Sequence, residues 1–407
     1  MKIEQKSMET ITGILDWPDN AAEGRIRTLS GSLLHTPDDP HISRALTEQF
    51  PVRSGQELTV EFQFKKIKSK QKQNQNRGKQ NNRNKNYRYN NHNRHNNSTP
   101  AQKAIVDKII AIEGLNPDEF KEVSPFENLI SIDPQPRLHL EYPDCPSANR
   151  LIDLFCPIGY GTRGLIVSPP KAGKTTLLQQ ICHGIKHNHP EVEVVALLID
   201  ERPEEVTDFK RNVPCLCLAS SNDQNTEQHI DLSILAIERA KRLVEKGKDV
   251  VVVLDSLTRM GRAFNASNKY AGSGRTMTGG LDSRALEVPK RLFGAARKGE
   301  NAGSLTILAS CLVDTGSRAD QIIFEEFKGT GNMELILNRD LADKRLFPAI
   351  NLAASGTRKE HLLLTEKELE TVTALRRRLI NMPPDQQIEQ LNAALKRFPT
   401  NQQLVGE

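Results

Sequence analysis

Residues 168–175 combine the side chains and the backbone freedom that phosphate binding needs. They read Ser-Pro-Pro-Lys-Ala-Gly-Lys-Thr and stand between an apolar run typical of a strand and a pattern that predicts a helix. Gly173 lets the backbone curl around phosphate oxygens, Lys174 can reach the β- and γ-phosphates, and the Thr175 hydroxyl can bind Mg²⁺. Ser168 replaces the first Gly of the usual Walker A pattern. The alternative interpretation is a chance Gly-Lys-Thr at a helix start.

A carboxylate at the end of the strand predicted over 250–254 has the position of a metal-binding acid. Asp255 follows four valines and a leucine. Beside a phosphate loop, such an acid is typical of the Walker B residue that holds Mg²⁺. The alternative is a strand-ending Asp that caps the next helix. The phosphate loop makes the metal role the stronger interpretation.

Asp200 and Glu201 end a third apolar strand, between these two motifs in the sequence. Ligands of open α/β sheets bind at the carboxyl ends of strands, so one of the two carboxylates could face the γ-phosphate and position water. Their spacing does not distinguish them. The acidic run 200–205 is also typical of a solvated helix start, which the helix dipole would stabilise.

The elements that must position these residues are predicted from about residue 151 onward. Short apolar strands alternate there with helical patterns, which indicates an α/β domain with a buried, largely parallel sheet over 151–407. The predicted strands cover 165–167, 192–199, 250–254 and 305–310, and the predicted helices cover 176–185, 230–246, 366–380 and 384–396.

The first 150 residues show different patterns. Short apolar segments alternate with turn residues over 9–64, which predicts a small β-barrel over 1–64. Its strands are expected at 10–15, 24–29 and 57–64. Residues 99–150 are expected to form a helix over 101–112, ended by Gly114, and then a Pro-rich connector.

Residues 65–98 separate these two parts and carry an excess of positive charge. The segment holds 11 Lys or Arg, 11 Asn, 4 Gln and no Asp or Glu. The other 373 residues carry 45 basic and 51 acidic side chains, a net charge of −6. The segment has too few apolar side chains to offset the entropy of folding, so it is expected to be disordered.

Composition excludes several classes of protein. No apolar run approaches the length of a membrane span, and the N-terminal residues lack the apolar core of a secretory signal. The six Cys, at 145, 156, 182, 215, 217 and 311, form no Cys-x-x-Cys pair. Reduced thiols in a cytoplasmic protein are therefore expected, rather than a disulfide framework or a zinc site.

Longer strings around these motifs resemble the Rho family of bacterial transcription termination factors. The resemblance is dense from about residue 128 to residue 360. The strings that carry it are 164–175, 198–206, 291–297, 314–318, 324–335, 347–350 and 355–360. The resemblance implies a RecA-type P-loop ATPase core behind an OB-like, cold-shock-type barrel. It also implies an RNA-dependent ATPase and 5′-to-3′ helicase that uses ATP and Mg²⁺, forms a homohexameric ring around single-stranded RNA and terminates transcription. RNA polymerase and elongation factors are the implied partners.

The same resemblance implies roles for individual residues. Lys174, the water-activating Glu201 and Arg358, an arginine finger that reaches across a subunit boundary, match catalytic positions. Phe347 matches a position that stacks on adenine, and Lys344 and Arg345 would support the subunit interface. ATP-binding positions are matched by Gly159, Tyr160, Gly161, Thr162, Arg163, Gly164, Lys171, Ala172, Gly173, Lys174, Thr175, Thr176, Arg202 and Phe347, and metal-binding positions by Thr175 and Asp255.

Two loops are implied to face RNA. Residues 272–280 form a Gly-rich basic loop expected to line the pore of the ring, and residues 314–318 form the second. The implied RNA-binding residues are Arg275, Thr278, Gly279, Arg318 and Lys328. The chain departs from the family where Arg275 and Arg318 replace the usual Lys. Either cation binds phosphate, and Arg adds planar hydrogen-bonding geometry.

The N-terminal half departs further from the family. The chain is expected to start at the barrel, and residues 23–27 read Glu-Gly-Arg-Ile-Arg in place of an aromatic strand. Aromatic stacking contributes about 1–3 kcal/mol per base, so pyrimidine-selective capture of RNA is expected to be weaker. The basic segment 65–98 would compensate by binding RNA phosphates, with Tyr87 and Tyr89 available to stack. An inert linker is the alternative.

Two other functions fit parts of the sequence. A rotary or export ATPase subunit would share the ATPase core, but the implied pore loops and the basic segment argue against it. An RNA-binding, condensate-forming protein with a vestigial ATPase would explain the Asn- and Gln-rich segment, but not the complete catalytic set. The sequence therefore favours RNA-dependent ATP hydrolysis.

Overall fold

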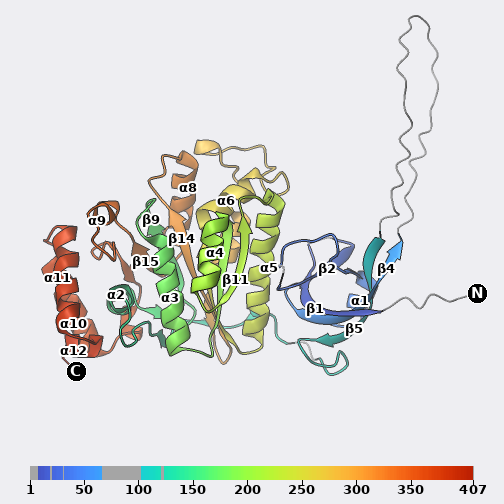
Figure 1. Cartoon of the computed structure of the whole chain (residues 1–407), viewed down its shortest axis with the longest axis horizontal. Coiled ribbons are helices and arrows are strands. Elements are labelled where there is room, and N and C mark those ends of the chain that lie inside the picture. Colours follow the sequence, from blue (N-terminus) through green and yellow to red (C-terminus); the bar gives the residue numbers. More distant parts are fainter. Residues whose placement is uncertain (1–7, 19–20, 31, 67–101, 121–122, 407) are drawn as a thin grey trace, which may run out of the picture.

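A small barrel and a larger α/β domain make up the part of the chain that the structure describes (Figure 1). That part comprises residues 8–18, 21–30, 32–66, 102–120 and 123–406 of a computed structural model. Most of the basic segment 65–98, including Tyr87 and Tyr89, lies outside the described residues. Among the described helices, none combines the length and the apolar composition needed to cross a bilayer.

Five strands close the barrel in the order β1-β2-β3-β5-β4. They are β1 (Glu9–Asp16), β2 (Glu23–Arg27), β3 (His41–Ser43), β4 (Glu57–Lys66) and β5 (Gln102–Ile112), with the short helix α1 (Arg44–Thr47) after β3. Leu15, Ile26, Ile42 and Leu58 are at most 1 % exposed in its core. A small closed barrel of five strands is OB-like, as the sequence predicts.

The helix predicted over 101–112 is wrong, because these residues form strand β5. Two β-bulges explain the error. Asp107 and Ile110 are the extra residues where the pairing with β4 shifts, so the buried positions of β5 fall two and then three residues apart. Spacings of three imitate the period of a helix. The barrel therefore includes residues up to Ile112, and the basic segment 65–98 stands in the sequence between its last two strands, β4 and β5.

The α/β domain is built on a nine-stranded sheet. Its strands are β6 (Ser131–Ile132), β9 (Arg163–Ser168), β10 (Glu193–Glu201), β11 (Leu216–Ser221), β12 (Asp249–Asp255), β13 (Arg297–Gly299), β14 (Ser304–Leu312), β15 (Met333–Ile336) and β16 (Gly356–Thr357); β7 (Arg137–Leu138) and β8 (Ile158–Gly159) pair separately. Strands β11-β10-β12-β14-β9-β15 run parallel in that order. Burial on both faces explains the unbroken valine run of β12.

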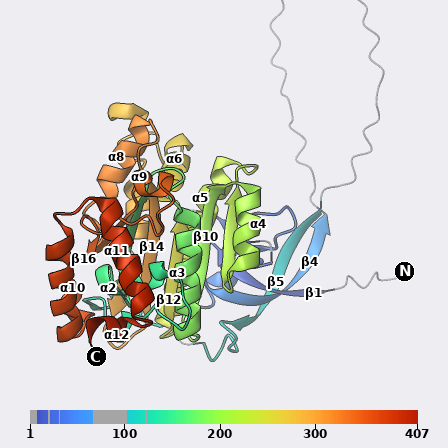
Figure 2. The same cartoon turned by 60° about the vertical axis from the view of Figure 1, so that its left-hand side comes forward.

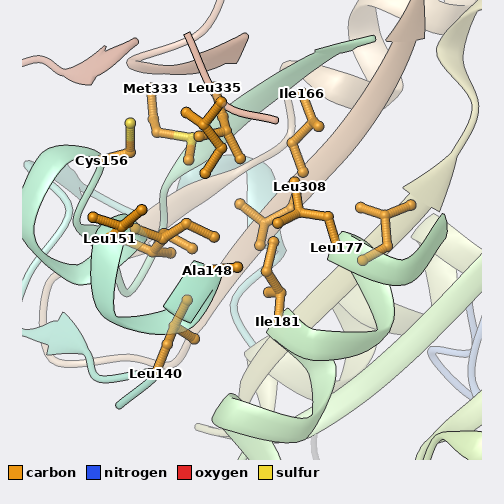
Figure 3. Close-up of a cluster of buried hydrophobic side chains, with 14 of the residues drawn as sticks. Leu140, Ala148, Leu151, Cys156, Ile166, Leu177, Ile181, Leu308, Met333 and Leu335 are labelled. Carbon is orange, nitrogen blue, oxygen red and sulfur yellow. The ribbon is translucent and has the colours of Figure 1, made fainter. Parts of the chain in front are cut away.

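Helices cover both faces of this sheet (Figure 2). Two hydrophobic clusters lie between the sheet and these helices. Helices α2 to α4 and the C-terminal helices α10 to α12 pack on the first cluster, where Leu151, Leu177 and Leu308 converge (Figure 3). Helices α5 to α8 pack on the second cluster. The helices are α2 (Ser147–Phe155), α3 (Lys174–Asn188), α4 (Pro203–Asn212), α5 (Thr226–Glu245), α6 (Leu257–Ala266), α7 (Glu287–Phe293), α8 (Arg318–Phe327), α9 (Arg339–Asp343), α10 (Glu366–Leu379), α11 (Pro384–Arg397) and α12 (Asn401–Val405), and single 3₁₀ turns cover Phe126–Asn128, Thr278–Gly280 and Glu360–Leu362.

The barrel is joined to α5 by ion pairs. Arg53 of the barrel donates to both carboxylate oxygens of Glu245 at 2.9 Å, and the Glu245 side chain is only 3 % exposed. The backbone N–H of Phe126 donates to the same carboxylate at 2.7 Å. A second bridge joins Arg239 of α5 to Glu113, which follows β5, at 2.6 Å. The contact between the barrel and the α/β domain thus depends on ion pairs whose carboxylates are buried.

Replacing Glu245 with Ala is expected to destabilise this junction by about 3 kcal/mol, because it leaves a half-buried guanidinium without its partner. A denaturant titration followed by the fluorescence of Trp17 measures the loss. Trp17 is the one Trp of the sequence and lines a cavity between the barrel and α5.

The matched control is Glu193→Ala. Glu193 pairs with Lys248 at 2.6 Å, but both side chains are nearly half exposed, so its loss is expected to cost less than about 1 kcal/mol. Equal shifts of the Trp17 transition in the two variants would contradict the proposed role of the buried pair.

Candidate active site

Residues 169–173 join β9 to α3 and form the predicted phosphate loop. Gly173 has φ 88° and ψ 19° at the start of α3, a left-handed conformation that favours glycine. No described side chain caps this helix end, so the N–H groups of its first turn are available to an anion. Ser168 is accommodated at the end of β9, where its hydroxyl donates to the carbonyl of Pro169 at 2.9 Å. The departure from the Walker A pattern therefore leaves the loop intact.

Lys174 lies between two buried carboxylates. Its ammonium group contacts Asp255 at the end of β12 and lies 3.9 Å from Oε2 of Glu201 at the end of β10. The two acidic residues are 1 % and 2 % exposed. Ser310 of β14 donates to Asp255 at 2.8 Å. Burial, and then the neighbouring Asp255 carboxylate, raise the pKa of Glu201. The structure thus brings together the three motifs that the sequence places far apart.

A bulge at the end of β10 decides which of its two acids faces Lys174. The pairing of β10 with β11 shifts between Ile199 and Glu201, and Asp200 has φ 55°. The bulge leaves Glu201 buried beside Lys174. The side chain of Asp200 is 38 % exposed and lies 3.8 Å from His229 instead. The choice that the sequence left open is therefore a matter of backbone geometry, and Glu201 is the acid at the ammonium group.

Arg259 is a site residue that the sequence reasoning missed. Its Nη2 lies 2.9 Å from Oε1 of Glu201, and its Nη1 donates to the carbonyl of Asp200. Ser256 caps α6 by accepting from the Arg259 N–H at 3.2 Å, which fixes the helix directly after Asp255. The sequence signal that could have identified it is its position one helical turn after Asp255, the acid that ends β12.

A cavity of about 320 Å³ opens beside the phosphate loop. Gly173, Thr176 and Phe347 line it. Phe347 is 46 % exposed, and its ring would lie 3.4 Å from a Cβ built on Gly173. An aromatic wall beside a phosphate loop suits a planar base. Arg202 stands apart at the start of α4, where its guanidinium lies 3.4 Å from Glu205.

The oxygen donors at this site fit Mg²⁺ bound together with nucleotide phosphates. The described residues contain no cluster of three His, Cys, Asp or Glu side chains that could hold a metal alone. The Thr175 hydroxyl and the Asp255 carboxylate are donors that Mg²⁺ takes alongside phosphate oxygens. Oε2 of Glu201 is buried without a hydrogen-bond partner in the described structure, so it is able to accept from a water.

The predicted nucleotide-binding residues fall into two groups within one chain. Lys171, Ala172 and the rest of the loop lie with Lys174, whereas residues 159–164 precede or begin β9, about 17 Å away at its other end. There the backbone N–H of Arg163 donates to the side-chain oxygen of Asn332 at 2.8 Å. The backbone carbonyl of Asn332 accepts from the N–H of Arg358, also at 2.8 Å. Arg358 therefore lies with the second group and not with the ammonium of Lys174.

Lys344 and Arg345 lie on the phosphate-loop side of the sheet. They directly follow α9, where Arg339 donates to the carbonyl of Pro170 in the loop. Lys344 also pairs with Asp385 of α11 at 2.5 Å. Within one chain, Lys344 and Arg345 therefore lie beside the phosphate loop and away from Arg358.

The two predicted RNA loops meet at the start of α8. A Cβ built on Gly279 would lie only 3.0 Å from the backbone of Arg318, so the first loop packs directly on the second. Arg275, Thr278, Gly279 and Arg318 are all exposed. Lys328 follows the last residue of α8, about 15 Å along the helix, and lies over the ring of Phe324. The structure thus groups four of the five predicted residues.

Helix α6 links the carboxylate site to these loops. Arg259 in its first turn holds Glu201, and Arg262, three positions later, bonds to Asp320 of α8 at 2.8 and 2.5 Å. Asp320 is 1 % exposed and also accepts from the hydroxyl of Thr315 at 2.6 Å. The loop that presents Arg318 is therefore tied to the same helix as the buried acid.

Comparisons with known proteins agree with this geometry. The nucleotide-binding domain of the ATP synthase alpha/beta family matches residues 148–357. Transcription termination factor Rho of Cereibacter sphaeroides is 43 % identical over 381 residues, which cover 93 % of this chain and 82 % of the relative. Rho of Streptomyces coelicolor is 50 % identical over 293 residues, which cover 72 % and 70 %. Rho of Micrococcus luteus is 44 % identical over 404 residues. This chain spans 54 % of that relative's length and 57 % of the length of the Borreliella burgdorferi relative.

Solved structures share the fold of the α/β domain. A type III secretion ATPase of pathogenic bacteria superposes with a TM-score of 0.55 at 24 % identity, over 66 % of this chain and 79 % of that one. The assembled ATPase EscN of enteropathogenic E. coli gives 0.54 at 25 % identity, over 68 % and 62 %. These likenesses support a RecA-type ATPase core.

Proposed function

Because the chain belongs to the family of transcription termination factor Rho, we propose that it is an RNA-dependent ATPase that moves along RNA from 5′ to 3′ and terminates transcription. The observation that carries the proposal is the arrangement around Lys174. An ammonium group and two buried carboxylates meet at an uncapped helix end, and α6 connects them to two exposed cationic loops. This arrangement suits hydrolysis of a nucleotide coupled to binding of a polyanion. Nascent RNA as the substrate implies action in the cytoplasm, with RNA polymerase and elongation factors as partners.

Glu201 is the group proposed to activate the attacking water. Its unpartnered Oε2 accepts a hydrogen bond from the water, and its raised pKa favours acceptance of a proton. Lys174 and the free N–H groups of α3 bind the phosphate oxygens and stabilise the charge that develops there. Mg²⁺, held with the phosphates by Thr175 and Asp255, would neutralise further negative charge. Phe347 stacks on the base.

We propose that a neighbouring subunit of a homohexamer completes this site. Arg358 lies at the far end of β9 from Lys174, so a single chain does not hold both groups at one nucleotide. An arginine supplied in trans stabilises the charge on the γ-phosphate. Residues 159–164, which adjoin Arg358, would belong to the same contributing face. Lys344 and Arg345 would then lie on the receiving face, beside the phosphate loop.

The barrel is proposed to hold RNA with little base stacking. Arg27 of β2 is only 2 % exposed because it pairs with Asp16 at 2.5 Å and with Asp39 at 3.5 Å. Arg25, the other cation of β2, is partly exposed. Phosphate contacts, including those of the basic segment 65–98, would then supply most of the initial affinity, with little sequence preference.

ATP hydrolysis by the purified protein, measured without RNA, with poly-C and with mixed-sequence RNA, tests the function. Stimulation by RNA without a poly-C preference is expected. Arg318→Ala should lower the stimulation and reduce the slope of log affinity against log salt by about one, because one phosphate contact is lost. Arg377→Ala, which removes an exposed arginine of α10, is the matched control. Hydrolysis that no RNA stimulates would contradict the proposal.

A further inference from the structure

Arg376 of α10 is a largely buried arginine that the proposed chemistry does not use. Its side chain is 26 % exposed, and its guanidinium lies over the ring of Phe155, 5.2 Å from the ring centroid. Three backbone carbonyls accept hydrogen bonds from it. Its Nη1 donates to Leu352 at 3.0 Å and to Ser355 at 2.9 Å, and its Nη2 donates to Phe155 at 2.5 Å. One guanidinium therefore joins the end of α2 to the segment 352–355.

The segment that Arg376 holds leads directly to Arg358. Strand β16 follows Ser355, and Arg358 is the first residue after the strand. A Cβ built on Gly356 would lie 3.6 Å from Nη2 of Arg376, so the guanidinium lies against the start of β16. Both arginines line one cavity of about 440 Å³. The anchoring arginine and the arginine proposed to act in a neighbouring site are thus parts of one surface.

The backbone on both sides of β16 is held in place, whereas the side chain of Arg358 is exposed. The hydroxyl of Thr357 donates to the carbonyl of Pro157 at 2.8 Å, and the N–H of Arg358 donates to the carbonyl of Asn332 at 2.8 Å. These bonds hold the segment at its C-terminal end, and Arg376 holds it at its N-terminal end. The reach of an exposed side chain depends on the backbone that carries it, so both anchors contribute to the position of Arg358.

We propose that Arg376 is a positioning residue for hydrolysis: it sets the place of Arg358 and thereby supports the nucleotide site of the neighbouring subunit, not that of its own chain. The inference rests on the proposed function, in which Arg358 acts across a subunit boundary. A planar guanidinium donates to carbonyls on two sides at once, whereas Lys carries a single nitrogen. Lys at this position keeps the charge but loses the fork, so the segment before β16 loses part of its anchor.

Arg376→Lys is expected to lower kcat of RNA-stimulated hydrolysis roughly 10²-fold, the cost of misplacing a catalytic group by about 1 Å. The KM for ATP should stay nearly unchanged, because Lys174 and the start of α3 bind the phosphates without Arg376. Arg377→Lys, which alters the adjacent exposed arginine of α10, is the matched control and should behave as the wild type. A raised KM with an unchanged kcat in Arg376→Lys would overturn the proposal.

Mixed rings show which subunit's site depends on Arg376. When Arg376→Lys is mixed and reassembled with Lys174→Ala, some sites combine Lys174 of the first protein with a correctly held Arg358 of the second, so hydrolysis should recover. When Arg376→Lys is mixed with Arg358→Ala, every site receives a displaced or a missing arginine, so hydrolysis should not exceed that of the two proteins assayed apart. Recovery with Arg358→Ala, or recovery in neither mixture, would overturn the proposal.

A reference mixture separates this proposal from the proposed function. Arg358→Ala mixed with Lys174→Ala regains hydrolysis if Arg358 acts across the boundary. If this reference mixture stays inactive, the trans arginine is wrong and the role of Arg376 falls with it. If the reference mixture recovers and the mixture of Arg376→Lys with Lys174→Ala does not, only the role of Arg376 is wrong.

The melting temperature and the ring mass of each variant verify folding and assembly. Arg376→Gln, whose amide can donate to one carbonyl, carries the same expectations and takes the place of the Lys variant if that protein does not assemble.

Discussion

Replacing Glu201 with Gln is expected to lower kcat of ATP hydrolysis by about 10²- to 10⁴-fold, the usual contribution of a general base. Gln retains the size of the side chain and an oxygen for Arg259, but it cannot take a proton from water. The KM for ATP should change little, because Lys174 and the α3 N-terminus bind the phosphates without it. Steady-state hydrolysis at saturating RNA, together with nucleotide binding, separates the two effects.

The matched control for this variant is Asp200→Asn. Asp200 is the adjacent carboxylate, and Asn tolerates its positive φ, so the bulge of β10 should persist. Because the Asp200 side chain points toward His229, its loss should leave kcat nearly unchanged. A large loss in Asp200→Asn with a small loss in Glu201→Gln would show that the bulge places the other acid at the water.

Replacing Arg358 with Ala is expected to reduce RNA-stimulated hydrolysis by about 10³- to 10⁵-fold, the range known for arginine fingers. The side chain does not meet Lys174 within its own chain, so nucleotide affinity of the isolated subunit should be affected far less than turnover. The backbone N–H of Arg358, which bonds to Asn332, is present in the variant, so the local fold should be unchanged.

A mixing experiment determines whether this arginine acts across a subunit boundary. Arg358→Ala and Lys174→Ala should each be inactive alone. In mixed rings, however, a site with Lys174 from one variant and Arg358 from the other is complete, so hydrolysis should reappear when the two proteins are mixed and reassembled. Mixed rings that stay inactive, with assembly verified by mass, would place Arg358 in its own chain's site.

The fold of the ATPase domain and the chemistry of its loop follow from local patterns. The valine run before Asp255 and the Gly-Lys-Thr turn before a helix are short-range signals, and parallel strands bring their carboxyl ends together. The choice between Asp200 and Glu201 depends on a bulge, because one extra residue moves a side chain to the other face. Residue types alone do not reveal such a shift.

Features that depend on longer-range structure were hidden from the sequence for similar physical reasons. The bulges of β5 changed its period, so a strand had the pattern of a helix. Residues 159–164 lie at the start of β9 and the phosphate loop follows its end, so the length of the strand separates two segments that are close in the sequence. Arg259 was missed because its role depends on the direction in which α6 leaves β12, and the capping Ser256 sets that direction.

The pairing of β4 with β5 has a consequence for how this protein can change over evolution. The two strands pair along nine positions, from Leu58 with Ile112 to Lys66 with Gln102. The chain therefore leaves the barrel and returns to it at neighbouring positions. The number of residues between β4 and β5 does not affect how these two strands pair. Loop-closure entropy changes by only about 0.6 kcal/mol for each doubling of length. Segments of very different length and composition can be exchanged at this point, by selection or by an engineer, while the strand pairing and the α/β domain remain the same.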